Sequence, residues 1–196
     1  MRSDSSALGN QRVALAAVLI LSFFLGGACA PLKPLDTAPS VDLDRFMGDW
    51  YVQGHVPAGA EATAHNAVES YARKGDSHQI DTTYTFRRGG FEGKVKTMNP
   101  TGFVEDKATN ATWGMRILGP FRAEYLIAYL DDSYTETIIA RRKRDYAWIM
   151  TRDAEIESER YRELVERLAA MGYDRAKIRR VPQRWPDHEH PHQPAP

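Results

Sequence analysis

The chain contains a single cysteine, Cys29, among its 196 residues. A disulfide bond within the chain is therefore excluded, and the fold must be stabilised by its hydrophobic core even in an oxidising compartment. Net charge is also absent, because 26 Lys and Arg residues balance 26 Asp and Glu residues, and the pI is about 7.0. This composition lacks the basic excess of nucleic-acid-binding proteins, so we expect no nucleic-acid partner.

The N-terminal apolar run is too short to span a bilayer comfortably. Residues 13–25 make a run of thirteen, whereas a membrane-spanning helix needs about 20. The run follows Arg2 and Arg12 and precedes the small residues 26–28, an order that is typical of a secretory leader. We therefore predict that residues 1–28 form a signal peptide, and we leave them out of the fold argument.

Cys29 lies at the end of this leader, where two kinds of cleavage site overlap. Residues 28–30 (Ala-Cys-Ala) fit ordinary cleavage after Ala30, whereas residues 25–29 resemble a bacterial lipobox, in which Cys29 becomes the lipidated first residue. The single cysteine stands where a lipoprotein needs it, so we predict a lipid anchor with acyl chains such as palmitate. Ala30 resembles the sorting pattern of outer-membrane lipoproteins. We expect a periplasm-facing outer-membrane lipoprotein, with a soluble periplasmic or secreted protein as the alternative.

The mature chain divides into three parts by composition. Residues 29–40 contain the lipidated cysteine and a Pro-rich tether, and residues 185–196 form a Pro- and His-rich tail that we expect to be disordered. Between them, residues 41–184 contain no repeat and no low-complexity block, which predicts one domain. About 165 mature residues are enough to bury a core. The tail histidines form no strong metal site, so we expect neither a bound metal nor a cofactor.

Much of the domain alternates between apolar and polar residues, which is typical of β-strands with one buried face. Turn signals at Gly89-Gly90 and at residues 99–102 and 131–133 separate the alternating segments. Eight strands are predicted, one at Trp50 and the others at 66–72, 79–88, 91–98, 112–118, 121–130, 135–141 and 146–152. Eight short strands at this spacing indicate an up-and-down barrel or a sandwich.

The periodicity changes once, near residue 156, where apolar residues begin to recur every three or four positions. This spacing predicts one amphipathic helix, with Ser158 as its N-cap and Gly172 as its left-handed terminator. The helix is expected to pack on the outer face of the last strands, which offers Leu126, Ala128, Ile138, Ala140, Ala147 and Ile149. A short strand at residues 177–181 is expected to join an edge. The fold class is therefore all-β, with one C-terminal α-helix packed outside.

Three motifs in this pattern resemble those of a known family. Residues 48–51 (Gly-Asp-Trp-Tyr) match the first signature of the lipocalins, residues 130–134 lie where the second falls, and residues 148–152 contain the third, which ends in Arg152. The resemblance runs from about residue 41 to residue 181 and is more specifically to the bacterial outer-membrane lipocalins. It implies an eight-stranded antiparallel up-and-down β-barrel that holds an apolar ligand, with a fatty acid or lysophospholipid implied by the bacterial subgroup.

Gly48, Trp50 and Arg152 are expected to close one end of this barrel. Trp50 and Arg152 lie on the first and last strands, which meet when eight strands form a closed sheet. A guanidinium stacked on an indole ring contributes about 0.5–2 kcal/mol. We therefore predict a structural role for these three residues and no catalytic one.

The predicted ligand-binding residues are inward-facing side chains, most of them aromatic. Tyrosine hydroxyls need hydrogen-bond partners when they are buried, and a ligand can supply them. The alternative is that these side chains simply fill the barrel. The predicted set is Tyr71, Tyr84, Phe86, Trp113, Met115, Tyr125, Tyr129 and Trp148, with Tyr146 expected on the same face.

These features lead to one functional hypothesis and two alternatives. We expect a membrane-anchored lipid-binding lipocalin that stores or transports fatty acids or lysophospholipids in the cell envelope. An enzyme is the first alternative, but the domain has no cysteine, and His55, His65 and His78 stand in no nucleophile arrangement, so we expect no enzymatic activity. An anchored adaptor without a ligand is the second. Residues 58–65 are the expected lid, and a homodimer is compatible with the resemblance.

Overall fold

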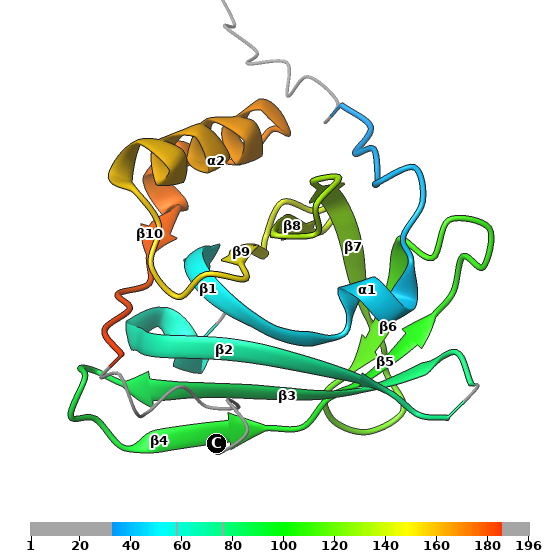
Figure 1. Ribbon diagram of the computed structural model, residues 1–196, viewed down its shortest axis with the longest axis horizontal. Helices are drawn as coiled ribbons and strands as arrows, with labels where there is room; N and C mark the ends of the chain where they lie inside the picture. Colours follow the sequence, from blue (N-terminus) through cyan, green and yellow to red (C-terminus); the bar gives the residue numbers. More distant parts are fainter. Residues whose placement is uncertain (1–32, 58, 76, 186–196) are drawn as a thin grey trace, which may run out of the picture. The chain divides into compact units, whose positions relative to one another are not determined.

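The computed structural model describes residues 33–57, 59–75 and 77–185 of the chain (Figure 1). These residues form a sheet of ten strands with two α-helices and two 3₁₀ turns. In chain order the elements are α1 (Leu43–Phe46), β1 (Gly48–Val56), η1 (Gly59–Thr63), β2 (Ala64–Arg73), β3 (Gln79–Arg88), β4 (Val95–Met98), β5 (Thr101–Val104), β6 (Thr112–Arg116), β7 (Ala123–Leu130), β8 (Glu136–Ala140), β9 (Ala147–Thr151), α2 (Ser158–Ala170), η2 (Arg175–Lys177) and β10 (Arg179–Arg180).

The sheet closes on itself through the pairing of β1 with β9. Neighbouring strands are antiparallel throughout, and the closing pair runs from Tyr51 opposite Thr151 to Val56 opposite Ala147. β10 adds to the second half of β1, with Gly54 opposite Arg180. The predicted fold, a closed eight-stranded antiparallel barrel with one helix outside, is confirmed.

β4 and β5 are the two halves of one barrel strand. Both pair with β3 in the same register, because Met98 lies opposite Tyr84 and Thr101 lies opposite Asp81. The prediction of a turn over residues 99–102 is therefore wrong for Thr101 and Gly102, which continue the strand. The backbone is interrupted only at Asn99 and Pro100, as expected from a proline that has no N–H to donate.

The loop between β6 and β7 is longer than the sequence pattern predicts. β6 ends at Arg116 and β7 begins at Ala123, so Ile117 and Phe121, which were expected in strands, belong to the loop. Gly119-Pro120 lies between them, and the exposed fractions are 58% for Ile117 and 83% for Phe121. The apolar run is interrupted here by two residues that favour turns.

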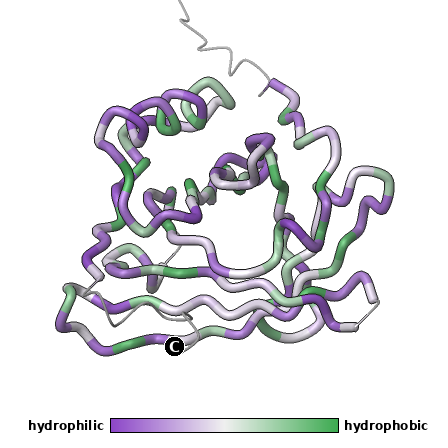
Figure 2. The backbone as a smooth tube through the Cα atoms, viewed as in Figure 1, coloured by the Kyte–Doolittle hydropathy of each residue, from purple (hydrophilic) through white to green (hydrophobic). Residues whose placement is uncertain are grey.

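Alternating side chains build one hydrophobic cluster inside the barrel and another outside it. Hydrophobic and hydrophilic residues alternate along the strands in Figure 2. The outer cluster joins the last strands to α2 and contains Leu35, Val56, Leu126, Ile138, Ala140, Ala147, Ile149, Leu164, Leu168 and Tyr173. The predicted packing of the helix on this outer face is confirmed. Within the described residues, none of the helices is both long and apolar enough to cross a membrane.

The boundaries of α2 agree with the predicted helix to within a few residues. Gly172 follows the helix with φ +94°, as predicted for a left-handed terminator. Ser158 is the first helical residue, and the N-cap position belongs to Glu157, whose side chain makes no capping hydrogen bond. The prediction of Ser158 as the cap is therefore wrong by one position.

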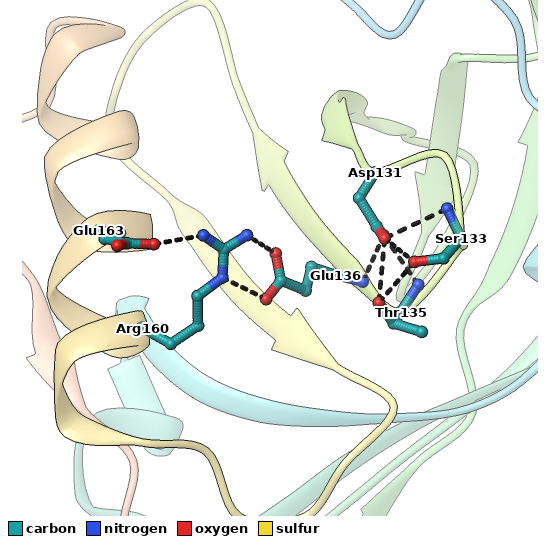
Figure 3. Close-up of polar contacts among 6 residues, drawn as sticks. All are labelled: Asp131, Ser133, Thr135, Glu136, Arg160 and Glu163. Atoms are coloured by element: carbon teal, nitrogen blue, oxygen red, sulfur yellow. Dashed lines mark hydrogen bonds and ion pairs between the residues drawn. The ribbon is translucent and has the colours of Figure 1, made fainter.

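Two polar clusters stabilise the start of β8 and its junction with α2 (Figure 3). The Asp131 carboxylate accepts hydrogen bonds from the backbone N–H groups of Thr135 (2.8 Å) and Glu136 (2.6 Å), which shapes the turn between β7 and β8. Burial acts to raise the pKa of Asp131, but hydrogen bonds from Ser133, Glu136 and Thr135 together lower it below its usual value. The Arg160 side chain of α2 pairs with Glu136 and with Glu163, so the helix is tied to β8 by charge as well as by apolar contact.

Part of the predicted tether packs against the barrel. Leu35 and Ala38 are buried, and the Ala38 N–H donates to the Ile127 carbonyl at 2.8 Å. Their apolar side chains account for this contact. At the other end Trp185, predicted to begin the tail, contacts the ring of Tyr51. The predictions for residues 1–32, including the signal peptide and Cys29, and for residues 186–196 lie outside the described residues.

Trp50 and Arg152 lie together at the end of the barrel that α1 covers. The Arg152 guanidinium carbon lies 3.9 Å from the centre of the Trp50 ring. Its N–H groups donate to the carbonyls of Arg45 (2.9 Å), Met47 (2.8 Å) and Asp49 (2.7 Å). These bonds join the end of β9 to α1 and to the start of β1.

Gly48 allows the close approach of Arg152 at this junction. Its φ is +93°, a backbone conformation that residues other than glycine rarely adopt. A Cβ at this position would lie 3.3 Å from the Arg152 Nη1. The backbone conformation and the lack of a side chain are therefore both required here.

Arg152→Lys is expected to lower the free energy of unfolding by about 2–4 kcal/mol, because an ammonium group cannot replace a planar guanidinium that bonds several carbonyls at once. Urea denaturation of the domain measures this change. Arg45→Lys is the matched control: Arg45 stacks on Tyr134 at an exposed position, and its replacement should cost less than about 1 kcal/mol. Equal losses in the two variants would contradict the role given to Arg152.

Candidate ligand-binding site

A cavity of about 190 Å³ lies inside the barrel. Its walls come from η1, from strands on both sides of the barrel and from the turns that follow β6 and β8. The residues that line it are Glu61, Glu69, Tyr84, Met98, Pro100, Met115, Ile117, Ala123, Glu124, Tyr125, Arg141, Tyr146 and Trp148. Most of this wall is aromatic or aliphatic, and the carboxyl groups are the main exception.

Four of the eight predicted ligand-binding residues line the cavity: Tyr84, Met115, Tyr125 and Trp148. The Trp148 ring contacts the other two rings, with centroid distances of 4.8 Å to Tyr84 and 6.4 Å to Tyr125. Phe86 is buried and stacks on Tyr84, with centroids 5.1 Å apart, but it is not part of the cavity wall. Phe86 therefore packs against Tyr84 of the cavity wall without lining the cavity itself.

Tyr71 and Trp113 lie deeper, at the base of the barrel. We use this term for the ring cluster of Phe46, Trp50, Tyr71 and Trp113, in which Phe46 of α1 lies 5.3 Å from Tyr71 and 5.6 Å from Trp113. The Tyr71 hydroxyl is hydrogen-bonded to that of Tyr125, so the base and the cavity wall are joined. Neither Tyr71 nor Trp113 lines the cavity.

Tyr129 faces the outside of the barrel, which corrects its predicted place in the ligand site. A register shift between Ile127 and Tyr129 interrupts the pairing of β7 with β8. Such a bulge inverts the alternation of the side chains that follow it. Tyr129 consequently packs with the outer cluster, and the Arg167 guanidinium of α2 lies 4.1 Å from the centre of its ring.

Glu61 and Glu69 are cavity residues that the sequence analysis missed. Glu69 is 0% exposed and lies two positions before Tyr71 on β2, so the period of two already puts both on the inner face. Glu61 lies on η1, inside the segment predicted as the lid. The alternation along β2 therefore indicated that Glu69 faces inward, but only the aromatic and aliphatic inward-facing residues were predicted to bind a ligand.

Burial controls the protonation of the groups around the cavity. It raises the pKa of Glu69 well above its usual range, and the negative charge of Glu61 raises it further, while the nearby hydroxyl of Thr82 has a smaller, opposite effect. Burial likewise raises the pKa values of Tyr84, Tyr125 and Tyr146. The interior is therefore a region in which negative charge is costly.

Four polar side chains of the cavity wall have unsatisfied atoms. Among the described residues, no hydrogen-bond partner is found for either carboxyl oxygen of Glu69, for the Tyr84 hydroxyl, for the Arg141 Nε or for the indole Nε1 of Trp148. The hydroxyl of Thr82, on the neighbouring strand, donates to the Pro100 carbonyl at 2.9 Å. A buried acceptor and a buried donor thus face the same cavity without partners, which is uncommon in folded proteins.

His55 lies buried in β1. Burial, together with the positive charge of Arg179, lowers its pKa to about 4. The imidazole is therefore neutral at physiological pH, and it is not part of the cavity wall.

Glu69→Gln is expected to change the pH dependence of stability. The folded-state pKa of Glu69 is raised above 4.5, so above that pH the unfolded chain loses this proton first and the wild-type free energy of unfolding falls as the pH rises. The variant lacks this fall and should be more stable than wild type near neutral pH by at least about 1 kcal/mol. Urea denaturation of both proteins across the acidic to neutral range measures the difference. A difference that stays constant with pH would contradict the burial of an unpaired carboxyl group.

Comparison with known proteins agrees with this geometry. A family model described as a lipocalin-like domain matches residues 41–183. The chain is 27% identical to temperature-induced lipocalin-1 of Arabidopsis thaliana over 164 residues, which cover 77% of this chain and 84% of that protein. It is 24% identical to outer membrane lipoprotein Blc of Escherichia coli strain K12 over 171 residues, which cover 84% of this chain and 93% of that protein.

Solved structures with similar folds have more distant sequences. Insecticyanin from the tobacco hornworm Manduca sexta aligns with a TM-score of 0.58 and 14% identity, over 79% of this chain and 86% of its own. Lobster apocrustacyanin A1 aligns with a TM-score of 0.55 and 13% identity, over 78% of this chain and 94% of its own. These likenesses concern the fold, while the family model covers nearly all of the barrel domain. The chain belongs to the lipocalin family.

Proposed function

We propose that this lipocalin binds a hydrophobic ligand in its barrel, and that it stores or transports fatty acids or lysophospholipids in the cell envelope. The observation that carries the proposal is the cavity, which is lined mainly by aromatic and aliphatic side chains and lies next to the closed base of the barrel. A concave apolar site with a few polar groups is the usual form of a small-molecule site.

The size of the cavity supports an amphiphile whose chain extends toward solvent. At about 190 Å³ it is smaller than the roughly 300–1,000 Å³ of typical ligand sites. Ile117 lines the cavity and begins the loop in which Leu118 and Phe121 are 86% and 83% exposed. An alkyl chain that leaves the cavity past Ile117 would meet apolar side chains. Met98 and Met115 in the wall are flexible enough to adjust to a longer chain.

Binding without catalysis is the function that the wall residues favour. The described residues that line the cavity include no Ser, Cys or His, so the wall lacks the groups that nucleophilic catalysis most often uses. Native mass spectrometry of the purified protein separates ligand binding from the adaptor alternative. Acyl lipids that copurify with the protein would support binding, whereas an empty barrel that accepts no added lipid would contradict it.

The proposed location is the periplasmic side of the outer membrane, with a lipid anchor on Cys29. Among the relatives, the Escherichia coli protein is named an outer membrane lipoprotein, and the matched region covers 93% of it. Residues 33–40 run from the N-terminal side onto the barrel, with Leu35 and Ala38 buried. An anchor at Cys29 would therefore hold the barrel close to a membrane surface.

Ala123→Phe is expected to weaken binding of a fluorescent fatty acid or lysophospholipid by about tenfold, because the added ring would occupy part of the cavity that Ala123 lines. Fluorescence titration measures the affinity. The control is Ala72→Phe, the same substitution at an exposed position of β2, which should leave the affinity unchanged. If the Ala123→Phe protein is normally folded and its affinity is unchanged, the ligand does not bind in this cavity and the proposal is contradicted.

Cys29→Ser is expected to shift the full-length protein from the membrane fraction to the soluble fraction, because a serine cannot receive the lipid through a thioether bond. Fractionation of bacterial cells that express each form measures the distribution. Membrane association that persists in the serine variant would contradict the lipoprotein hypothesis and leave the barrel's binding function untouched.

A further inference from the structure

Glu69 is a fully buried acid at the cavity wall without a partner. It is 0% exposed, it lines the cavity, and neither of its carboxyl oxygens has a hydrogen-bond partner among the described residues. Buried carboxyl groups in proteins are normally paired, because burial of an unpaired one is costly. A ligand that supplies the missing partner would explain why this carboxyl group is unpaired inside the cavity.

Among the described residues, Glu69 forms no ion pair. Arg141 is the one basic residue among those that line the cavity; its Nη1 forms an ion pair with Asp145 at 3.4 Å, while its Nε is buried without a hydrogen-bond partner. Glu124, at the same wall, is paired with Arg142. Glu61 also lines the cavity, and its charge raises the pKa of Glu69. Three carboxyl groups and one guanidinium line the cavity, so a cationic group that enters it is favoured over an anionic one.

Aromatic rings lie beside Glu69 in the cavity wall, where Tyr84 is its partner on the neighbouring strand. Tyr84 and Tyr146 contact Trp148 with centroid distances of 4.8 and 5.3 Å, and Tyr125 contacts it at 6.4 Å. The faces of such rings attract cations, and tryptophan does so most strongly. The unpartnered Nε1 of Trp148 is a hydrogen-bond donor, so the same ligand end should also have an acceptor oxygen within reach of it.

We propose that the inner end of the cavity binds the ammonium group of an amphiphile, with Glu69 as its counter-ion and the rings of Tyr84, Tyr146 and Trp148 around it. The apolar chain then points past Ile117 toward solvent. This inference rests on the proposed function and adds the charge of the ligand's polar end. The shared chemistry is an ammonium group on an alkyl or acyl chain, whether from a simple amine or from the ethanolamine head of a lysophospholipid.

Entry of the cation changes the protonation of Glu69. Burial raises the pKa of this carboxyl group, so the empty cavity favours the neutral acid, and an ammonium ion replaces the proton when it binds. Binding of an amine should therefore release protons, whereas binding of a neutral alcohol should not. The titratable and charged groups around the cavity are Glu61 on η1, Tyr71 on β2, Tyr84 on β3, Glu124 and Tyr125 on β7, Arg141 after β8 and Tyr146 before β9.

The test compares three ligands of equal chain length: decylamine, decanol and decanoate. Isothermal titration of the wild-type domain should give a dissociation constant for decylamine at least about tenfold below that for decanoate, with decanol between them. Titrations at mildly acidic pH in two buffers of different ionisation enthalpy should show proton release with decylamine only. Equal or tighter binding of decanoate would overturn the proposal, and this comparison needs no variant.

Glu69→Gln tests whether this carboxyl group is responsible. The substitution keeps the shape of the side chain and removes its charge, so the preference for decylamine over decanoate should fall to less than about twofold. Glu159→Gln, an exposed position on the outer helix, is the matched control and should keep the full preference. Circular dichroism verifies that both variants are folded. A preference that survives in Glu69→Gln would overturn the assignment.

Two further outcomes separate this inference from the proposed function. If none of the three ligands binds, both the lipid-binding function and the ammonium site are wrong. If decanol and decanoate bind and decylamine has no advantage, the barrel is a lipid site and only the ammonium site is wrong. If decylamine is preferred, a lysophosphatidylethanolamine and a lysophosphatidylglycerol of equal chain length identify the source: a Glu69-dependent preference for the first supports a lysophospholipid head, and its absence supports a simple amine.

Discussion

The pairing of β1 with β9 is the constraint on which the rest of the structure depends. This pairing, from Tyr51 opposite Thr151 to Val56 opposite Ala147, leaves the sheet with an inner and an outer face. Alternating residues of every strand are then assigned to one face or the other. The inner face forms the base and the cavity wall, while the outer face of β7, β8 and β9 receives α2. The cavity and the helix contact therefore follow from the same closure.

The sequence alone was sufficient for the strands, the helix and the face on which the helix packs, because period two and period 3.6 are direct consequences of backbone geometry. The errors occur where the period is interrupted. The bulge between Ile127 and Tyr129 turns Tyr129 outward, and the break at Asn99 and Pro100 divides one strand into β4 and β5. A bulge depends on how the partner strand pairs. The pattern within β7 alone therefore gives no signal for it.

The sequence predicted a set of inward-facing aromatic side chains, but not how far along the barrel each one lies. Of the predicted inward-facing aromatic residues, Tyr84, Tyr125 and Trp148 line the cavity. Tyr71 and Trp113 belong instead to the base, because Phe46 of α1 packs against both rings. Where α1 packs is decided by long-range contacts, such as the hydrogen bonds from Arg152 to carbonyls 107 and 105 positions away. A pattern of local periodicity contains no information about such contacts.

The base of the barrel contributes mainly to stability, whereas the cavity contains the groups proposed for ligand binding. At the base, Arg152 donates to several carbonyls, and the Trp50 Nε1 donates to Phe46 at 2.9 Å. In the cavity, Glu69 and the Trp148 Nε1 stay unpaired, and each such group costs about 1–3 kcal/mol. A fold of ordinary stability tolerates this cost only when other regions offset it. The hydrogen bonds of the base thus offset the cost of leaving polar groups of the cavity unpaired. A ligand that pairs these groups removes that cost, and the free energy recovered contributes to its binding.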